Sequence, residues 1–248
     1  MTATTNVLRG LFATLVAWQA AIWLLSPPHY MMPSPMAVGA VFANSSGFLL
    51  FHLGITAAEI LAGLAIGTAC GIAVALLIVA LPRLGTIVWP VVLVLQALPV
   101  FAIAPLLVLW FGFGMASKVV MATLIIFFPI ASSFADGLRR TDRDLLDATA
   151  LTDATALQTL WFVRVPLALP NLVSGLRVAA ALAPLGAVVG EWVGASGGLG
   201  FVLLQANARM QTDIMFAALA LLAALTLLLR YAVDELAAPL IPWAIETR

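Results

Sequence analysis

The chain has 248 residues, of which 64% are hydrophobic and only 9% are charged. A soluble domain carries about 25% charged residues, so this composition excludes an ordinary water-soluble protein and predicts an integral membrane protein. Eleven basic and eleven acidic residues give a formal net charge of zero, with no sign of a nucleic-acid-binding surface. The single cysteine, Cys70, excludes an internal disulfide and a metal site built from paired thiols.

Six apolar segments are long enough to cross a bilayer, which takes about 20 helical residues. We therefore predict an all-α membrane protein, with one transmembrane domain over 1–248. After the first segment, prolines at 27, 28, 33 and 35 break the helix and predict an external connection, followed by a short helix near 36–50. The first segment lacks a convincing cleavage site, so we expect it to be retained. The predicted spans cover about 8–26, 54–80, 87–110, 117–136, 171–192 and 213–236.

Basic residues predict the orientation of these spans, because Lys and Arg concentrate on the cytoplasmic side. With the N-terminus inside, six spans also return the C-terminus to the cytoplasm. The outer side then holds Lys118 and Arg209. The inner side holds Arg9, Arg83, Arg139, Arg140, Arg143, Arg164 and Arg248.

Between the fourth and fifth spans, a predicted cytoplasmic loop over 137–170 is too polar to cross the membrane. Apolar residues recur in it near helical spacing, and Thr141 with Asp144 resembles a capping box. Asp153 can cap a second helix, and Pro166 and Pro170 are expected to end the segment. We predict two short amphipathic helices joined by a turn. Their apolar faces need either the spans of the same chain or a soluble protein as partner, and the pattern favours neither.

This loop resembles the motif of binding-protein-dependent ABC importer permeases, in which Glu-Ala-Ala, a glycine and an Ile-x-Leu-Pro close follow at fixed spacing. The spacing is kept here, whereas the identities match only at Ala148 and Pro166. Asp153 replaces the glycine of the turn, and Asp tolerates left-handed conformations better than most residues. The residues implied to contact an ATPase are Asp147, Ala148, Thr149, Asp153, Val163, Val165 and Pro166.

Two further stretches resemble the nitrate, sulfonate and taurine branch of that family. One is Met32-Pro33-Ser34-Pro35. The other runs from Pro99 through Trp110-Phe111-Gly112 to Lys118. The glycine-rich stretch 190–211 is similar to permeases for pyrimidine precursors of thiamine. The resemblance implies a type I ABC importer permease fold and a substrate such as a thiamine pyrimidine precursor, with a sulfonate, taurine or nitrate as the alternative.

The resemblance also implies the partners. Two permease copies would form a homodimer in the bilayer of a bacterial inner membrane, with an external substrate-binding protein and a cytoplasmic ATPase dimer. The chain contains no Gly-x-x-x-x-Gly-Lys-Ser/Thr phosphate loop, so ATP and Mg would be bound by the partner ATPase. We expect no enzymatic activity, cofactor, metal or nucleic-acid partner in this chain.

Polar residues within the spans are the candidates for the substrate pathway, because such groups are costly in lipid. These candidates are Gln96, Ser132, Ser133 and Glu191. Glu191 can alternatively be an interfacial carboxylate that reaches headgroup water or pairs with Arg209. His52 and Glu59 read as ordinary interfacial groups at the outer end of the second span.

Two other classes of function are disfavoured. An ion-coupled secondary transporter usually shows internal repeats and broken helices with buried carboxylates, and no repeat is evident here. An intramembrane enzyme would need a catalytic motif, but the spans contain neither HExxH nor GxSxG.

Overall fold

The computed structural model describes residues 2–244, and regular structure in them is entirely helical. The α-helices are α1 (Thr2–Leu25), α2 (Pro35–Asn44), α3 (Ser46–Ala80), α4 (Pro82–Ala97), α5 (Val100–Phe111), α6 (Met115–Arg139), α7 (Arg143–Ala150), α8 (Ala156–Thr159), α9 (Val165–Gly194), α10 (Leu199–Ala208) and α11 (Thr212–Ala237). A π-helical turn, η1 (Leu160–Arg164), joins α8 to α9, and a 3₁₀ turn, η2 (Ala238–Leu240), follows α11.

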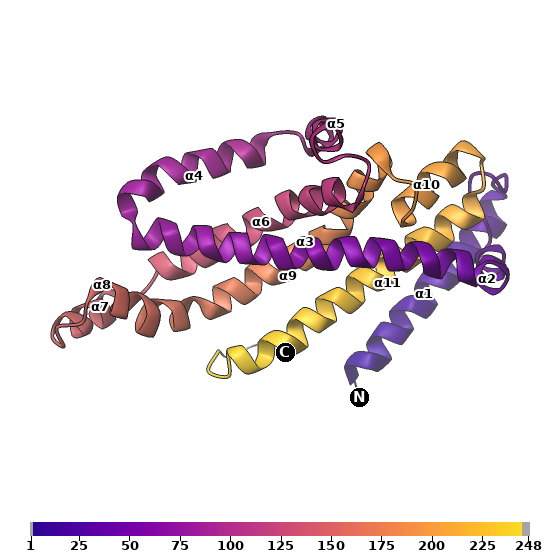
Figure 1. The fold of residues 1–248 in the computed structure, drawn as a ribbon. Coiled ribbons are helices and arrows are strands. Elements are labelled where there is room, and N and C mark those ends of the chain that lie inside the picture. Colours follow the sequence, from indigo (N-terminus) through magenta and orange to yellow (C-terminus); the bar gives the residue numbers. More distant parts are fainter. Residues whose placement is uncertain (1, 245–248) are drawn as a thin grey trace.

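Four of the described helical segments are long and apolar enough to cross a membrane. They are α3, α6, α11, and the segment that runs from α8 through η1 into α9. They run side by side in Figure 1, and α3, α6, α9 and α11 share one core. Ile60, Ile126 and Ala183 are fully buried in that core, which is rich in alanine. The predicted spans over 54–80, 117–136, 171–192 and 213–236 coincide with these helices.

Helix α6 lies between α3 and α9 at very short range, because glycines line both contacts. A Cβ atom added at Gly63 of α3 would lie 2.6 Å from the Cβ of Ala122. A Cβ added at Gly186 of α9 would lie 2.8 Å from the Cα of the same alanine. Small residues allow this approach, and dispersion contacts then hold helices together in lipid, where no hydrophobic effect operates between them. The α3 glycine at this contact therefore packs against a helix of the same chain.

The single span predicted over 87–110 is instead two helices, α4 and α5, bent by 100° relative to each other. The break falls at Leu98 and Pro99, which both have extended backbone conformations. Pro99 cannot donate the amide hydrogen bond that would continue α4, and its ring disfavours a helical conformation in the residue before it. Apolar composition predicted that this segment is helical but not that it bends.

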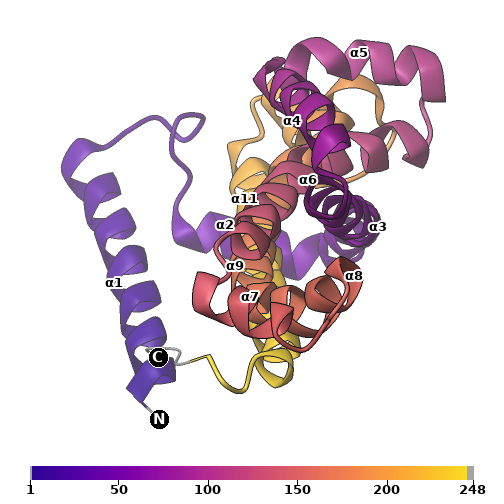
Figure 2. The same cartoon turned by 90° about the vertical axis from the view of Figure 1, so that its left-hand side faces the viewer.

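Helix α1 stands to one side of the bundle (Figure 2). Trp18 connects it to the rest, by stacking on Phe216 of α11 at 5.3 Å and by donating its indole N–H to the Pro33 carbonyl at 3.1 Å. The expected first span, 8–26, is helical up to Leu25, and its crossing of the membrane stays a prediction. The expected short helix near 36–50 is α2, whose N-cap Ser34 accepts the amide of Ala37.

Candidate functional site

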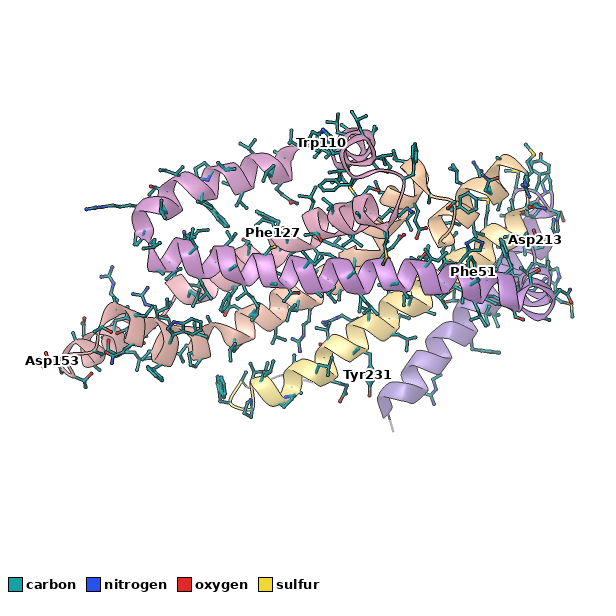
Figure 3. The ribbon with its side chains drawn as sticks, in the orientation of Figure 1. Phe51, Trp110, Phe127, Asp153, Asp213 and Tyr231 are labelled. Carbon is teal, nitrogen blue, oxygen red and sulfur yellow. The ribbon has the colours of Figure 1, made fainter. Side chains whose placement is uncertain are left out.

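Helices α7 and α8 form the predicted loop at one end of the molecule, where Figure 3 labels Asp153. The cap of α7 is one residue later than the sequence predicted. Asp142 accepts the amide of Asp144 at 3.0 Å. The Thr141 hydroxyl instead donates to the Leu138 carbonyl at the end of α6.

Asp153 occupies a left-handed conformation, with φ at +50°, in the turn between α7 and α8. This confirms that the turn survives where the related motif has glycine. Asp153 does not cap the second helix, as had been expected. Thr155 does so instead, through a reciprocal capping box with Gln158. Asp153 is thereby assigned to the turn and Thr155 to the helix start.

The second loop helix is not a separate short element, contrary to prediction. Residues Ala156–Gly194 form one continuous helical segment, and Pro166 lies in the first turn of α9 without ending it. The π-turn η1 precedes it, so the amide of Val165 bonds to the Leu160 carbonyl, five residues back. This wider turn is consistent with a proline that lacks an amide hydrogen and would clash in a regular helix. The second loop helix is therefore continuous with α9.

The apolar side chains of the loop divide into two sets. Leu160 is buried against α3, α6 and α9. By contrast, Leu151, Leu157 and Phe162 are 88%, 61% and 78% exposed. Leu157 also lines a cavity of about 720 Å³ between the loop helices and the α3–α4 turn. The chain's own spans thus cover only part of the loop's apolar surface.

The predicted ATPase-contact residues gather at this end of the molecule. Asp147, Ala148 and Asp153 are exposed. Thr149 is half-buried, and it lines the cavity and accepts a weak hydrogen bond from Thr159 at 3.4 Å. Val163, Val165 and Pro166 are half-buried along η1 and the start of α9.

The four predicted pathway residues do not converge. Gln96 is exposed near the end of α4, just before the bend. Ser132 and Ser133 are half-buried on α6, and Ser133 faces Gly175 of α9. Glu191 is buried at the opposite end of the bundle from Asp153, with 1% of its surface exposed. Their role in a pathway remains a prediction.

Glu191 belongs to a polar cluster that fastens the start of α10. Its carboxylate accepts the Thr56 hydroxyl at 2.6 Å and the backbone amides of Gly200 and Phe201. The amide of Leu199 donates to Thr56 at 2.7 Å. A carboxylate here also opposes the positive end of the helix dipole. Glu191 is therefore neither an interfacial group nor paired with Arg209, and it holds together α3, α9 and α10.

His52 and Gly198 complete this cluster. The amide of Gly198 donates to His52 Nδ1 at 3.0 Å, so this nitrogen acts as an acceptor. Gly198 has φ at +107°, and a Cβ atom there would collide with the Glu191 carboxylate. The residue at this position must adopt a positive φ and must lack a Cβ atom, and only glycine does both.

Glu59 and Lys118 lie beside this cluster, with 3.7 Å between Glu59 Oε1 and Lys118 Nζ. Both are buried, so they are not the ordinary surface groups that the sequence suggested. One signal was present in the sequence: His52, Thr56 and Glu59 are spaced by four and three residues and share one face of a helix. The packing of α3 against α6 and α9 determines that this face is buried. The same packing brings Lys118 and Glu191 to it.

Comparison with known proteins agrees with this architecture. Residues 65–241 match the family model described as binding-protein-dependent transport system inner membrane component. A probable ABC transporter permease protein of Haemophilus influenzae is 48% identical, over 90% of this chain and 91% of its own length. The riboflavin transport system permease protein RibX of Chloroflexus aurantiacus is 38% identical, over 94% and 88%. The formylaminopyrimidine transport permease protein ThiX of Halalkalibacterium halodurans is 36% identical, over 92% of each chain.

A solved structure shows the same fold. A chain of the MetNI methionine ABC transporter, in an inward-facing conformation, aligns with a TM-score of 0.63 at 23% identity, covering 79% of this chain and 95% of its own. The family match covers well over half of this sequence, and it agrees with the helical bundle and its protruding loop. The chain belongs to the binding-protein-dependent ABC transporter permeases and is a multi-pass inner membrane protein, a transport subunit without catalytic activity of its own.

Proposed function

We propose that the chain forms half of a substrate pathway and couples it to a separate ATPase through residues 141–166. The observation that carries this proposal is the uncovered apolar surface of the loop helices. Leu151, Leu157 and Phe162 would each favour burial by roughly 1.5–3 kcal/mol. They lie beside charged residues at the tip of the molecule, which suits a soluble protein better than lipid.

The ATPase would supply the energy. ATP and Mg would bind to that subunit, and its closure would press on α7 and α8. Because α8 continues through η1 into α9, the displacement would reach the buried bundle without an intervening flexible loop. The loop would thus transmit motion by packing contacts.

A second copy of the chain and an external binding protein would complete the importer. Helix α1 supports the second copy, since Trp23, Leu24 and Leu25 near its end are 75%, 84% and 75% exposed. The helices α2 and α10, at the end opposite the loop, would face the binding protein (Figure 1). Both termini would then lie in the cytoplasm.

The proposed substrate is a small polar heterocycle such as a thiamine pyrimidine precursor. Support comes from the relative described as transporting formylaminopyrimidine and from the glycine-rich stretch 190–211. The alternative is a sulfonate, taurine or nitrate, on the basis of the branch that the Pro99–Lys118 stretch resembles. Gln96, Ser132, Ser133 and Glu191 remain the candidates for contacts along the pathway.

Replacement of Ala148 by Glu tests the coupling surface. Ala148 is exposed on α7, so the change leaves the fold intact while placing a charge in the proposed contact. Burying an unpaired charge costs several kcal/mol, so we expect loss of ATPase co-purification and of ATP-driven uptake. The matched control is Ala208→Glu, also exposed but on α10, which should co-purify normally. Normal association of the Ala148 variant would refute the proposed coupling surface.

A further inference from the structure

A second cavity, of about 520 Å³, lies beside the start of α4. It is bounded by the α3–α4 turn, the first half of α4, the end of α6 and the end of η1. Figure 1 shows the α3–α4 turn at the same end of the molecule as α7 and α8. The lining residues are Ile78, Val79, Pro82, Gly85, Thr86, Trp89, Pro90, Arg139 and Arg164.

Two arginines are the charged residues in this lining, and they come from different elements. Arg139 is the last residue of α6, and Arg164 is the last residue of η1. No carboxylate lines the cavity, and among residues 2–244 neither arginine forms an ion pair or donates a side-chain hydrogen bond. Arginine is not deprotonated in proteins, so the cavity carries two positive charges without a negative partner.

Trp89 holds the side chain of Arg139 at the cavity. The guanidinium carbon of Arg139 lies over the indole ring, 5.6 Å from its centroid. Phe128 of α6 stacks on the same indole with ring centroids 6.3 Å apart, which restrains the ring. A cation–π contact attracts the charge of the guanidinium but does not supply an oxygen acceptor for its five N–H donors. Arg139 is therefore positioned and still able to donate to an anion.

The other side chains around the cavity favour a ligand that is partly apolar. Apart from Thr86, the remaining lining is apolar or glycine, and the Thr86 hydroxyl already donates to the Arg83 carbonyl at 2.8 Å. Residues adjacent to the lining on α3 and α4 expose further apolar surface, since Leu77, Leu84 and Ile87 are 37%, 46% and 66% exposed. A ligand that fits both features carries a negative charge and a long apolar remainder.

The position of the cavity along the helices fits the boundary between lipid and water. Helices α3 and α6 are long enough to cross a membrane, and they end beside the cavity at Ala80 and Arg139. Tryptophan and arginine are both enriched at the ends of spanning helices. Basic pockets between such helices bind the headgroups of anionic lipids.

We propose that this cavity binds the headgroup of an anionic phospholipid from the leaflet on the side of the coupling loop. Arg139 and Arg164 donate to the phosphate oxygens, which the planar guanidinium suits well. The acyl chains lie along the exposed apolar side chains of α3 and α4. The lipid thereby links α4, α6 and η1 from outside the bundle. This inference goes beyond the proposed import function, because the lipid is bound whichever substrate is carried.

Lipid binding by the full-length permease, purified in detergent, tests the site. Native mass spectrometry measures the affinity for phosphatidylglycerol and, separately, for phosphatidylcholine with the same acyl chains. Arg139→Gln removes one phosphate donor, and Trp89→Leu removes the ring that holds it. The matched control is Arg140→Gln, which makes the same change at the next residue, also exposed but outside the lining of the cavity.

We expect the wild type and the Arg140 variant to bind phosphatidylglycerol equally and more tightly than phosphatidylcholine. Arg139→Gln should weaken phosphatidylglycerol binding by about tenfold, the loss expected for one charged hydrogen bond, and Trp89→Leu should weaken it less. Equal weakening by Arg139→Gln and Arg140→Gln would show that the arginines act only as a general positive surface. That result, or equal binding of the two lipids by the wild type, would overturn the proposal.

Glycerol 1-phosphate distinguishes a lipid from a soluble anion with the same phosphate chemistry. At equal concentration it should leave phosphatidylglycerol bound, because it lacks the acyl chains. Displacement of the lipid would assign the cavity to a soluble anion and would overturn the lipid site. The assay needs neither the ATPase nor uptake, so its outcome is independent of the proposed function.

Discussion

Glu191 shows how much one buried side chain can organise in a membrane protein. It takes the hydroxyl of Thr56 and two backbone amides at the start of α10, groups that would otherwise be unsatisfied at a helix N-terminus. Asp153 contributes in a different way, because its side chain is exposed and its role is to adopt the left-handed backbone conformation of the turn. A left-handed residue other than glycine costs about 1–2 kcal/mol, less for Asp than for most. Both residues hold a turn, one by hydrogen bonds and one by conformation.

Replacement of Glu191 by Leu should destabilise the protein strongly. The change leaves the backbone amides of Gly200 and Phe201 without an acceptor, at about 1–3 kcal/mol each, while the Thr56 hydroxyl can still donate to the His52 carbonyl. Glu191→Gln retains one oxygen and should be intermediate. Thermal unfolding in detergent measures this order, with Glu235→Leu as the exposed control, and equal melting temperatures for all of these variants would contradict the assigned role.

At the scale of elements, the α3–α6–α9 packing depends on the absence of side chains. The glycines of α3 and α9 bring α6 close enough for backbone contact on both sides. One ion pair between α9 and α11 adds a second kind of link, since Asp234 of α11 accepts from Arg177 of α9 at 2.7 Å. Arg230 donates to the same oxygen at 3.1 Å from within α11. Charge pairing in this bundle therefore occurs both at its margin and in its interior, where Glu59 and Lys118 are buried.

Gly186→Ala and Gly54→Ala should have opposite effects on stability. At Gly186 the added Cβ lies 2.8 Å from a backbone atom of α6, so the helices must separate, which costs about 1–3 kcal/mol. At Gly54 the added Cβ meets nothing, and the better helix propensity of Ala should stabilise α3 by up to about 1 kcal/mol. Melting temperatures of the two variants provide the comparison, and equal shifts would contradict the close packing of α6 and α9.

The whole molecule has two distinct ends. Figure 3 shows Asp153 at one extreme and Asp213 at the other, separated by the length of the bundle. The coupling surface lies at the first end. The polar cluster around Glu191 lies toward the second. Because α9 runs from η1 past Glu191, one helix connects both ends.

Cysteine labelling tests the proposed orientation of these ends. In a Cys70→Ser background, Arg209→Cys should react with a membrane-impermeant maleimide in intact cells. Thr152→Cys should react only after permeabilisation, since both sites are exposed but lie at opposite ends. The reversed pattern would show that the termini are not cytoplasmic.

Sequence alone determined much about this protein. Apolar length predicted the four long helices, because the cost of bare backbone in lipid forces such segments to be helical. Fixed motif spacing located the turn at Asp153, because a turn is a local feature of the chain. The family followed from the same residues.

Only the tertiary structure decided the rest. The chain bends by 100° at Pro99, whereas at Pro166 the helix continues from α8 through the π-turn η1 into α9. The sequence does not tell which of these outcomes a proline will have. His52, Thr56, Glu59, Lys118 and Glu191 come from three helices, and their meeting depends on rotation and depth in the bundle. Hydrophobic periodicity gives each helix a buried face, but the partners of that face are selected by packing between segments far apart in sequence.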